Sequence, residues 1–136
     1  MFRRCGALKD LTPLATWNTE NVTNIWGMFQ FCISLTSLSA LSDWSTKNVT
    51  DMNRLFDGCS AVTDLNPLTN WNTENVTNMM EMFDGCNKLS DVSVINDWDI
   101  TKVADFNNMF RNCPFHLEFT KRAGTWSSDG TFIPTT

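Results

Sequence analysis

The chain has 136 residues, 42% of them hydrophobic, with a formal net charge of −5 at pH 7 and a pI near 4.6. This length suits one domain, and the hydrophobic content is too high for a disordered protein. The acidic balance argues against nucleic acid and anionic membranes, which are contacted by lysine and arginine. No apolar run of about 18 residues occurs, so no membrane-spanning segment is expected.

A repeat of 27 residues organises almost the whole chain. Its clearest copy, TENVTNMMEMFDGC, occupies residues 73–86 and recurs in modified form at residues 19–32, 46–59 and 100–113. Such a period is typical of units that bury their apolar faces against their neighbours. We therefore predict an α/β solenoid over residues 1–113, with about five units that each contain a short strand and a short helix. The units are expected to start near Met1, Met28, Leu55, Met82 and Met109.

The beginning of the chain falls inside a repeat. Met1 and Phe2 occupy the repeat positions of Met28 and Phe29, and the first ten residues lack the apolar stretch of a signal peptide. We therefore expect the chain to be an excised piece of a longer repeat array, or a mature fragment.

Each unit is expected to contain one short strand. After the cysteine, an apolar residue recurs at every third position up to the tryptophan, without the alternation of a long strand. This spacing favours strands centred on residues 36–39, 63–66 and 90–93. Pro13 and Pro67 follow at one shared offset, where proline would end a strand.

A helix of about two turns is expected in each unit between the turn and the cysteine. Met79, Met82, Phe83 and Cys86 have the spacing of one helix face. Thr23, Thr50 and Thr77 are the expected N-caps, and Gly58 and Gly85 are expected to end their helices in the left-handed conformation.

Residues 114–136 depart from the repeat and are expected to cap the last unit. The leucine pattern is replaced there by Pro114, Phe115, His116 and Leu117. Phe132 and Ile133 are expected to fold back over the open face of the last unit. His116, the only histidine, is interpreted as a structural residue of this cap.

The repeat resembles those of BspA-like leucine-rich-repeat surface proteins, found in Gram-positive bacteria, mycoplasmas and some protists. The resemblance rests on the combined W-x-T-x-N-V-T and M-F-x-x-C patterns over residues 1–113, although Lys102-Val103-Ala104 replaces Asn-Val-Thr in the fourth copy. It implies a leucine-rich-repeat-like fold and a cell-surface or secreted protein that mediates adhesion or protein interaction. It supplies no catalytic residue.

No residue pattern in the sequence indicates an enzyme. No nucleophile motif, zinc-protease motif or phosphate-binding glycine loop is present, so we expect no catalytic residue, cofactor or metal, and no small-molecule ligand. The five cysteines lie in one column, which favours a ladder of buried thiols over disulfides or metal ligands. The tryptophan column is expected to pack in the core, and the three Asn-Val-Thr sequences are expected to be structural.

Outward-facing polar columns on the expected strands are the predicted binding surface. They would engage a host or matrix protein, or another surface protein, and the carboxylates could instead bind a divalent cation or only keep the face solvated. The residues of this strand-face strip are Asp10, Thr12, Ser37, Ser39, Asp64, Asn66, Asp91 and Ser93.

Trp26 and Phe31 form a second predicted site, because other copies hold mostly polar residues at their positions. An exposed apolar patch of this kind often marks a contact with a partner or a subunit. Two functions are therefore open: a non-enzymatic interaction or adhesion module, or a structural spacer or assembly segment of a larger surface protein.

Overall fold

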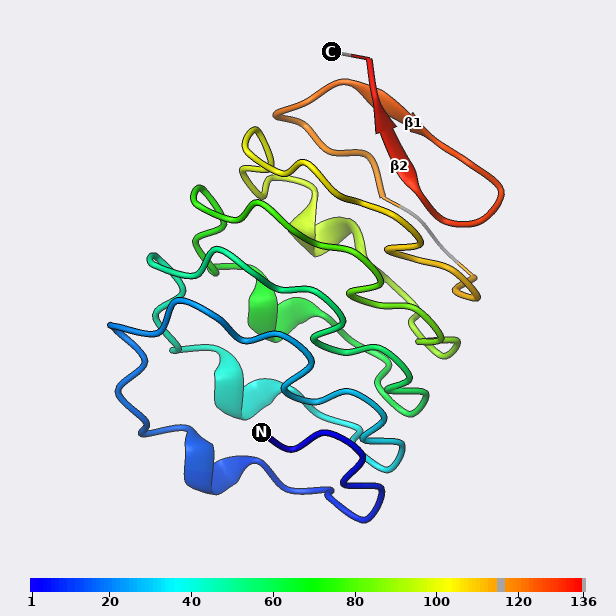
Figure 1. Ribbon diagram of the computed structural model, residues 1–136. Helices are drawn as coiled ribbons and strands as arrows, with labels where there is room; N and C mark the ends of the chain where they lie inside the picture. Colours follow the sequence, from blue (N-terminus) through cyan, green and yellow to red (C-terminus); the bar gives the residue numbers. More distant parts are fainter. Residues whose placement is uncertain (115–116, 136) are drawn as a thin grey trace.

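The computed structural model describes residues 1–114 and 117–135, so His116 lies outside the described residues. The chain winds into a stack of coils, with the N-terminal coil at one end and a two-stranded hairpin at the other (Figure 1). Residues one repeat apart lie above one another, as in the isolated parallel bridges from Asn24 to Asp51 and from Asp51 to Asn78. The 27-residue period is therefore the length of one coil.

The regular elements are few and short. Four 3-10 helices follow one another in successive coils: η1 (Thr12–Leu14), η2 (Ser39–Leu41), η3 (Asn66–Leu68) and η4 (Ser93–Ile95). Two antiparallel strands, β1 (Gly124–Trp126) and β2 (Phe132–Pro134), form the terminal hairpin. The described residues contain no α-helix, and no unit has a strand of its own. The predicted α/β solenoid of strand and helix units is therefore wrong.

The expected helices are replaced by turns whose backbone bonds run between coils. Within residues 52–59, Arg54 and Gly58 have positive φ angles of 56° and 74°, which interrupt a right-handed helix. The Phe56 N–H donates to the carbonyl of Met82 in the next coil, not to the residue four positions earlier. The left-handed conformation of Gly58 and Gly85 was predicted correctly. The expected helices were not, because consecutive turns produce the apolar spacing of three and four residues.

The expected strands are replaced by 3-10 turns. Asp64 and Asp91 form one isolated parallel bridge, after which each coil enters its 3-10 helix. Pro13 and Pro67 lie in the first turn of η1 and η3. Because proline has a φ angle suited to the start of a helix, these prolines begin a turn and do not end a strand.

Columns of identical side chains form the core. Rings of the phenylalanine column stack with centroids 5.0–5.8 Å apart from Phe2 to Phe110. The indole Nε1 of Trp71 donates to the carbonyl of Leu41 in the preceding coil, and Trp44 and Trp98 repeat this bond one coil away. Trp44, Trp71 and Trp98 are therefore part of the core, as predicted, and each ties its coil to the previous one, whereas Trp17 is 41% exposed.

The cysteines form a ladder of thiols that are buried in the middle of the stack. The Cys59 and Cys86 thiols each donate to a phenylalanine carbonyl of the preceding coil at 3.1 Å. Burial raises the pKa of Cys59 to about 12 and that of Cys86 well above its ordinary value. Cys5 is exposed and Cys113 is half-buried.

Thiol labelling with a water-soluble disulfide reagent at pH 8 should modify Cys5 rapidly and Cys59 and Cys86 only when the stack opens. The thiolate is the reactive form, and burial disfavours it. We expect one fast equivalent in the native protein and five in denaturant, with Cys5→Ser removing the fast phase. Rapid native labelling of Cys59 would contradict the buried ladder.

The hairpin covers the last coil. Phe132 is buried and contacts Phe106 edge to face with centroids 5.0 Å apart, while the Phe110 N–H donates to the carbonyl of Gly130. The Arg122 guanidinium donates to the carbonyl of Val103 at 2.7 Å. Ile133 is half exposed, so only Phe132 of the two predicted capping residues covers the core.

Candidate interaction surface

The strand-face strip is exposed, as expected, and its acidic residues also have a structural role. The Asp64 Oδ1 accepts from the N–H of Asn66, and the Asp91 Oδ1 accepts from both the N–H and the hydroxyl of Ser93. Asp10 does the same with Thr12, and the hydroxyl of Ser37 accepts from the Ser39 N–H. These Asx and Ser turns lead the chain into the 3-10 helices.

The hydrogen bonds of these turns keep the strip acidic. Donation by the Thr12 hydroxyl lowers the pKa of Asp10, and donation by the Ser93 hydroxyl lowers the pKa of Asp91. Both carboxylates are therefore ionised at neutral pH. The column needs no ligand to account for its residues, and its role in binding stays a prediction.

Two further columns of Asx turns run through the stack, and the sequence analysis did not recognise them. One includes Asp51, whose Oδ1 accepts from the Asn53 N–H; the other includes Asn72, which accepts from the Glu74 N–H. The sequence does carry a signal for them, because an aspartate or asparagine recurs at each of these two repeat positions, and such residues often accept from the N–H two positions later.

The two apolar residues of the second coil are each covered by a different arginine. The Arg3 guanidinium lies 5.6 Å from the Trp26 ring centroid, and that of Arg4 lies 5.1 Å from the Phe31 ring. Trp26 remains 41% exposed, whereas Phe31 is half-buried. A Cβ added at Gly58 would overlap the Phe31 ring, so this ring packs directly on the glycine backbone of the next coil. Of the predicted pair, Trp26 is the freer to meet a partner.

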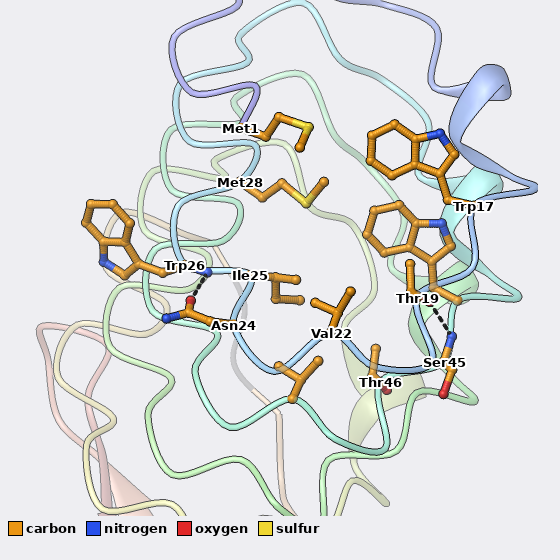
Figure 2. A pocket seen from close by; sticks show the side chains of 12 residues that line it. Met1, Trp17, Thr19, Val22, Asn24, Ile25, Trp26, Met28, Ser45 and Thr46 are labelled. Carbon is orange, nitrogen blue, oxygen red and sulfur yellow. Dashed lines mark hydrogen bonds between the residues drawn. The ribbon is translucent and has the colours of Figure 1, made fainter.

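An open apolar cavity of about 270 Å³ lies at the N-terminal end of the stack (Figure 2). Val22, Ile25, Met28 and Trp44 are among its lining residues, and Figure 2 shows Trp17 on one side of it. The Trp17 and Trp44 rings stack with their centroids 6.2 Å apart. Figure 2 shows Trp26 on the opposite side, pointing away from the cavity. The predicted tryptophan column places Trp17 in the core, but its side chain is 41% exposed.

This end of the stack carries most of the exposed large apolar side chains in the part of the chain that the structure describes. Four of the five are on the first two coils, and the fifth, Ile133, is on the terminal hairpin. The four define the N-terminal end face: Met1, Trp17, Trp26 and Ile33.

A column of buried polar groups runs along another side of the stack. The Gln30 amide donates to Asp57 at 2.7 Å, and Arg111 contacts Asp84 at 2.5 Å. Asp57 and Asp84 are one coil apart, and both are at least 93% buried. Burial first, and then the charges of Asp84 and Glu81, raise the pKa of Asp57 against the opposing effect of Gln30.

Asp57→Asn should stabilise the protein at pH 7 by about 1 kcal/mol, the size typical of one buried polar group. Because the native pKa is above the ordinary value of 3.8, the native state binds more protons, and stability falls as pH rises from about 3.8 through the raised pKa. Denaturant unfolding at pH 4 to 7 should show this fall reduced in the variant. Asp43→Asn removes the same charge from an exposed site, and an equal gain there would contradict the explanation.

The described residues contain no group of three or more His, Cys, Asp or Glu residues arranged to hold a metal. Within the described part of the chain, no helix is long and apolar enough to cross a membrane.

Comparison with known proteins gives one match. A family model described as "Mycoplasma protein of unknown function, DUF285" matches residues 1–127. Neither the curated proteins nor the solved structures contain a match. The matched region includes every coil and the first strand of the hairpin.

Proposed function

The chain belongs to the family described as Mycoplasma protein of unknown function, DUF285, and we propose that it is a non-enzymatic module that binds a partner protein. The surface proposed for this contact is the N-terminal end face. We further propose that the protein acts at the cell surface or is secreted, which rests only on the resemblance of its repeat to surface proteins.

The observation that carries this proposal is the exposure of large apolar side chains on the first two coils. At the C-terminal end, Phe119 and the hairpin residue Phe132 cover the last coil, and both are at most 9% exposed. At the N-terminal end, Trp17 is 41% exposed beside an open cavity, whereas Trp44, one coil further, is 5% exposed. Exposed large apolar side chains beside an open apolar cavity are typical of surfaces that bind other molecules.

Assembly within a larger surface protein is the second candidate function. It is favoured by the same end face, because stacking on another coil would bury it as each inner coil is buried. The strand-face strip remains the alternative binding surface, since its exposed carboxylates are held in fixed positions by the Asx turns.

Binding of the purified protein to a panel of immobilised extracellular-matrix and serum proteins tests the surface. Ile33→Lys and Trp26→Glu should abolish binding that the wild-type protein shows. Ile133→Lys is the matched control, because Ile133 is 50% exposed and Ile33 is 55% exposed, but Ile133 lies on the hairpin.

Equal binding by all three variants would exclude the N-terminal end face as the surface. Loss of binding in Asp64→Lys and Asp91→Lys would instead assign the contact to the strand-face strip. Circular dichroism and unfolding curves of each variant would show that its fold is retained.

A further inference from the structure

We propose that a polar groove between two inner coils binds a sugar residue of a glycan. The groove has a volume of about 490 Å³, within the range of about 300–1,000 Å³ that ligand pockets occupy. It lies between the coil of residues 55–81 and the coil of residues 82–108, and the inference goes beyond the proposed function because it concerns a different surface. We call it the intercoil groove and define it by six of its lining residues: Asn70, Asn72, Glu74, Asp97, Asp99 and Lys121.

Hydrogen bonds between the two coils hold the buried part of this groove in place. Trp71, Thr73 and Trp98 line it and are at most 4% exposed. The Thr73 hydroxyl donates to the Asp99 carbonyl at 2.8 Å, and the Trp98 indole donates to the Leu68 carbonyl at 3.1 Å. The groove is therefore formed before any ligand arrives, which reduces the ordering cost of binding.

Asx turns fix two polar side chains of the groove and leave one atom of each free. The Asn72 Oδ1 accepts from the Glu74 N–H at 2.9 Å, so its amide nitrogen remains as a donor without a partner among the described residues. The Asp99 Oδ1 accepts from the N–H and the hydroxyl of Thr101, so its Oδ2 remains as an acceptor. The bond from the Thr101 hydroxyl lowers the pKa of Asp99, which is therefore ionised at neutral pH.

The other polar side chains of the groove add both donors and acceptors. Asn70, Glu74 and Lys121 are exposed and form no side-chain hydrogen bond or ion pair within the described part of the chain. Asp97 accepts from the Thr120 hydroxyl through its Oδ1, which leaves its Oδ2 free. Donors are thus supplied by two amides and an ammonium, and acceptors by three carboxylates.

This mixture of groups favours one class of ligand. A sugar hydroxyl both donates and accepts, so neighbouring hydroxyls match a lining that offers both kinds of group. Three carboxylates beside one lysine would repel a sulfated or phosphorylated ligand, and an apolar side chain would meet mainly polar groups here. The described residues also hold no acidic group arranged for a metal. A neutral polyhydroxyl ligand therefore fits the groove best.

A smaller concavity two repeats earlier shows why the intercoil groove is open. Glu20 there is equivalent to Glu74, and Lys47 is equivalent to Thr101. The Lys47 ammonium lies 3.2 Å from the Glu20 carboxylate, and this concavity has a volume of about 290 Å³. Thr101 donates instead to Asp99, which leaves Glu74 without an ion pair in the described chain. The change from lysine to threonine therefore leaves the glutamate available to a ligand.

Saturation-transfer NMR of the full chain with cellobiose, lactose and N,N′-diacetylchitobiose tests the inference, with a sulfated heparin disaccharide as the comparison. We expect saturable binding of at least one neutral disaccharide and none of the sulfated one. Amide chemical-shift changes caused by the bound sugar should centre on residues 70–74 and on the side-chain amides of Asn70 and Asn72. Absence of transfer to every neutral disaccharide, or a preference for the sulfated one, would overturn the inference.

Matched variants locate the site. Glu74→Ala should weaken sugar binding about ten- to hundredfold, the range for a hydrogen bond to a charged group. Glu20→Ala removes the equivalent side chain two coils earlier and should leave the affinity unchanged. Thr101→Lys should place an ammonium beside Glu74, as Lys47 lies beside Glu20, and should weaken binding although it deletes no carboxylate. Circular dichroism would show that each variant keeps its fold.

Equal affinity of wild type and Glu74→Ala for the sugar would overturn the location of the site. If Glu74→Ala instead abolishes binding of an oligolysine peptide while no neutral sugar binds, the groove recognises cations and the inference is wrong. Ile33→Lys should leave sugar binding unchanged, and Glu74→Ala should leave binding of a partner protein at the N-terminal end face unchanged. Failure of this inference and failure of the proposed function are therefore separate results.

Discussion

Phe56→Ala should lower the free energy of unfolding by about 3–5 kcal/mol, the usual cost of deleting a buried phenylalanine ring. Phe56 is 1% exposed and stacks on Phe29 and Phe83 with both centroid distances at 5.8 Å. Its ring also lies 6.4 Å from that of Trp71. Since domains have a total stability of about 5–15 kcal/mol, this loss should bring the stack close to unfolding at ambient temperature.

The position in the stack makes this loss unusually consequential. Each coil contacts mainly the coil before and the coil after, so a cavity in the middle weakens two interfaces at once. Guanidinium unfolding followed by tryptophan fluorescence should show a lower midpoint and a less cooperative transition. Phe2→Ala is the matched control at the end of the column, where the ring is half-buried and stacks only on Phe29 within the column. Equal losses in the two variants would contradict the column as the source of stability.

The period and the buried columns could be predicted from the sequence because they depend only on which side chains recur. The phenylalanine, tryptophan and cysteine columns each recur every 27 residues, and their members Phe29, Trp71 and Cys86 are buried, as a stacked repeat requires. The conformation between them was predicted wrongly. An apolar spacing of three and four fits an α-helix, but it equally fits consecutive turns whose N–H groups bond to the next coil.

Two local features explain why these segments form turns and not helices: positive φ angles and hydrogen bonds to the neighbouring coil. Arg54 and Glu81 have positive φ angles of 56° and 53° at one repeat position, although neither residue favours that conformation. The bonds to the neighbouring coils impose it, as the Arg54 N–H donates to the carbonyl of Met80. Propensity of a single residue cannot reveal a conformation that tertiary contacts impose.

The candidate site was predicted only in part. Trp26 was identified because it breaks the repeat, and the structure leaves it exposed. The cavity was not predicted, because the repeat pattern places Trp17 in the core with the other tryptophans of its column.

Gly130→Ala should destabilise the protein by about 2–5 kcal/mol by lifting the hairpin off the last coil. Gly130 has a φ of 77°, which costs other residues about 1–2 kcal/mol, and overpacking adds about 1–3 kcal/mol. An added Cβ would overlap the backbone of Phe110 and Arg111, which cannot move aside as a flexible side chain could. The bond from the Phe110 N–H to the Gly130 carbonyl, 3.0 Å long, would be lost with the contact.

Loss of the hairpin should have a particular signature, because it covers Phe106 and Phe110 in the last coil. Exposure of these rings should increase the binding of a hydrophobic dye. Unfolding should also begin at the C-terminal end, which faster amide hydrogen exchange at residues 106–113 would show. Gly6→Ala is the matched control, since its added Cβ would lie 3.6 Å from Ile33, an ordinary contact. If Gly6→Ala and Gly130→Ala unfold alike, the cap is not what protects this end.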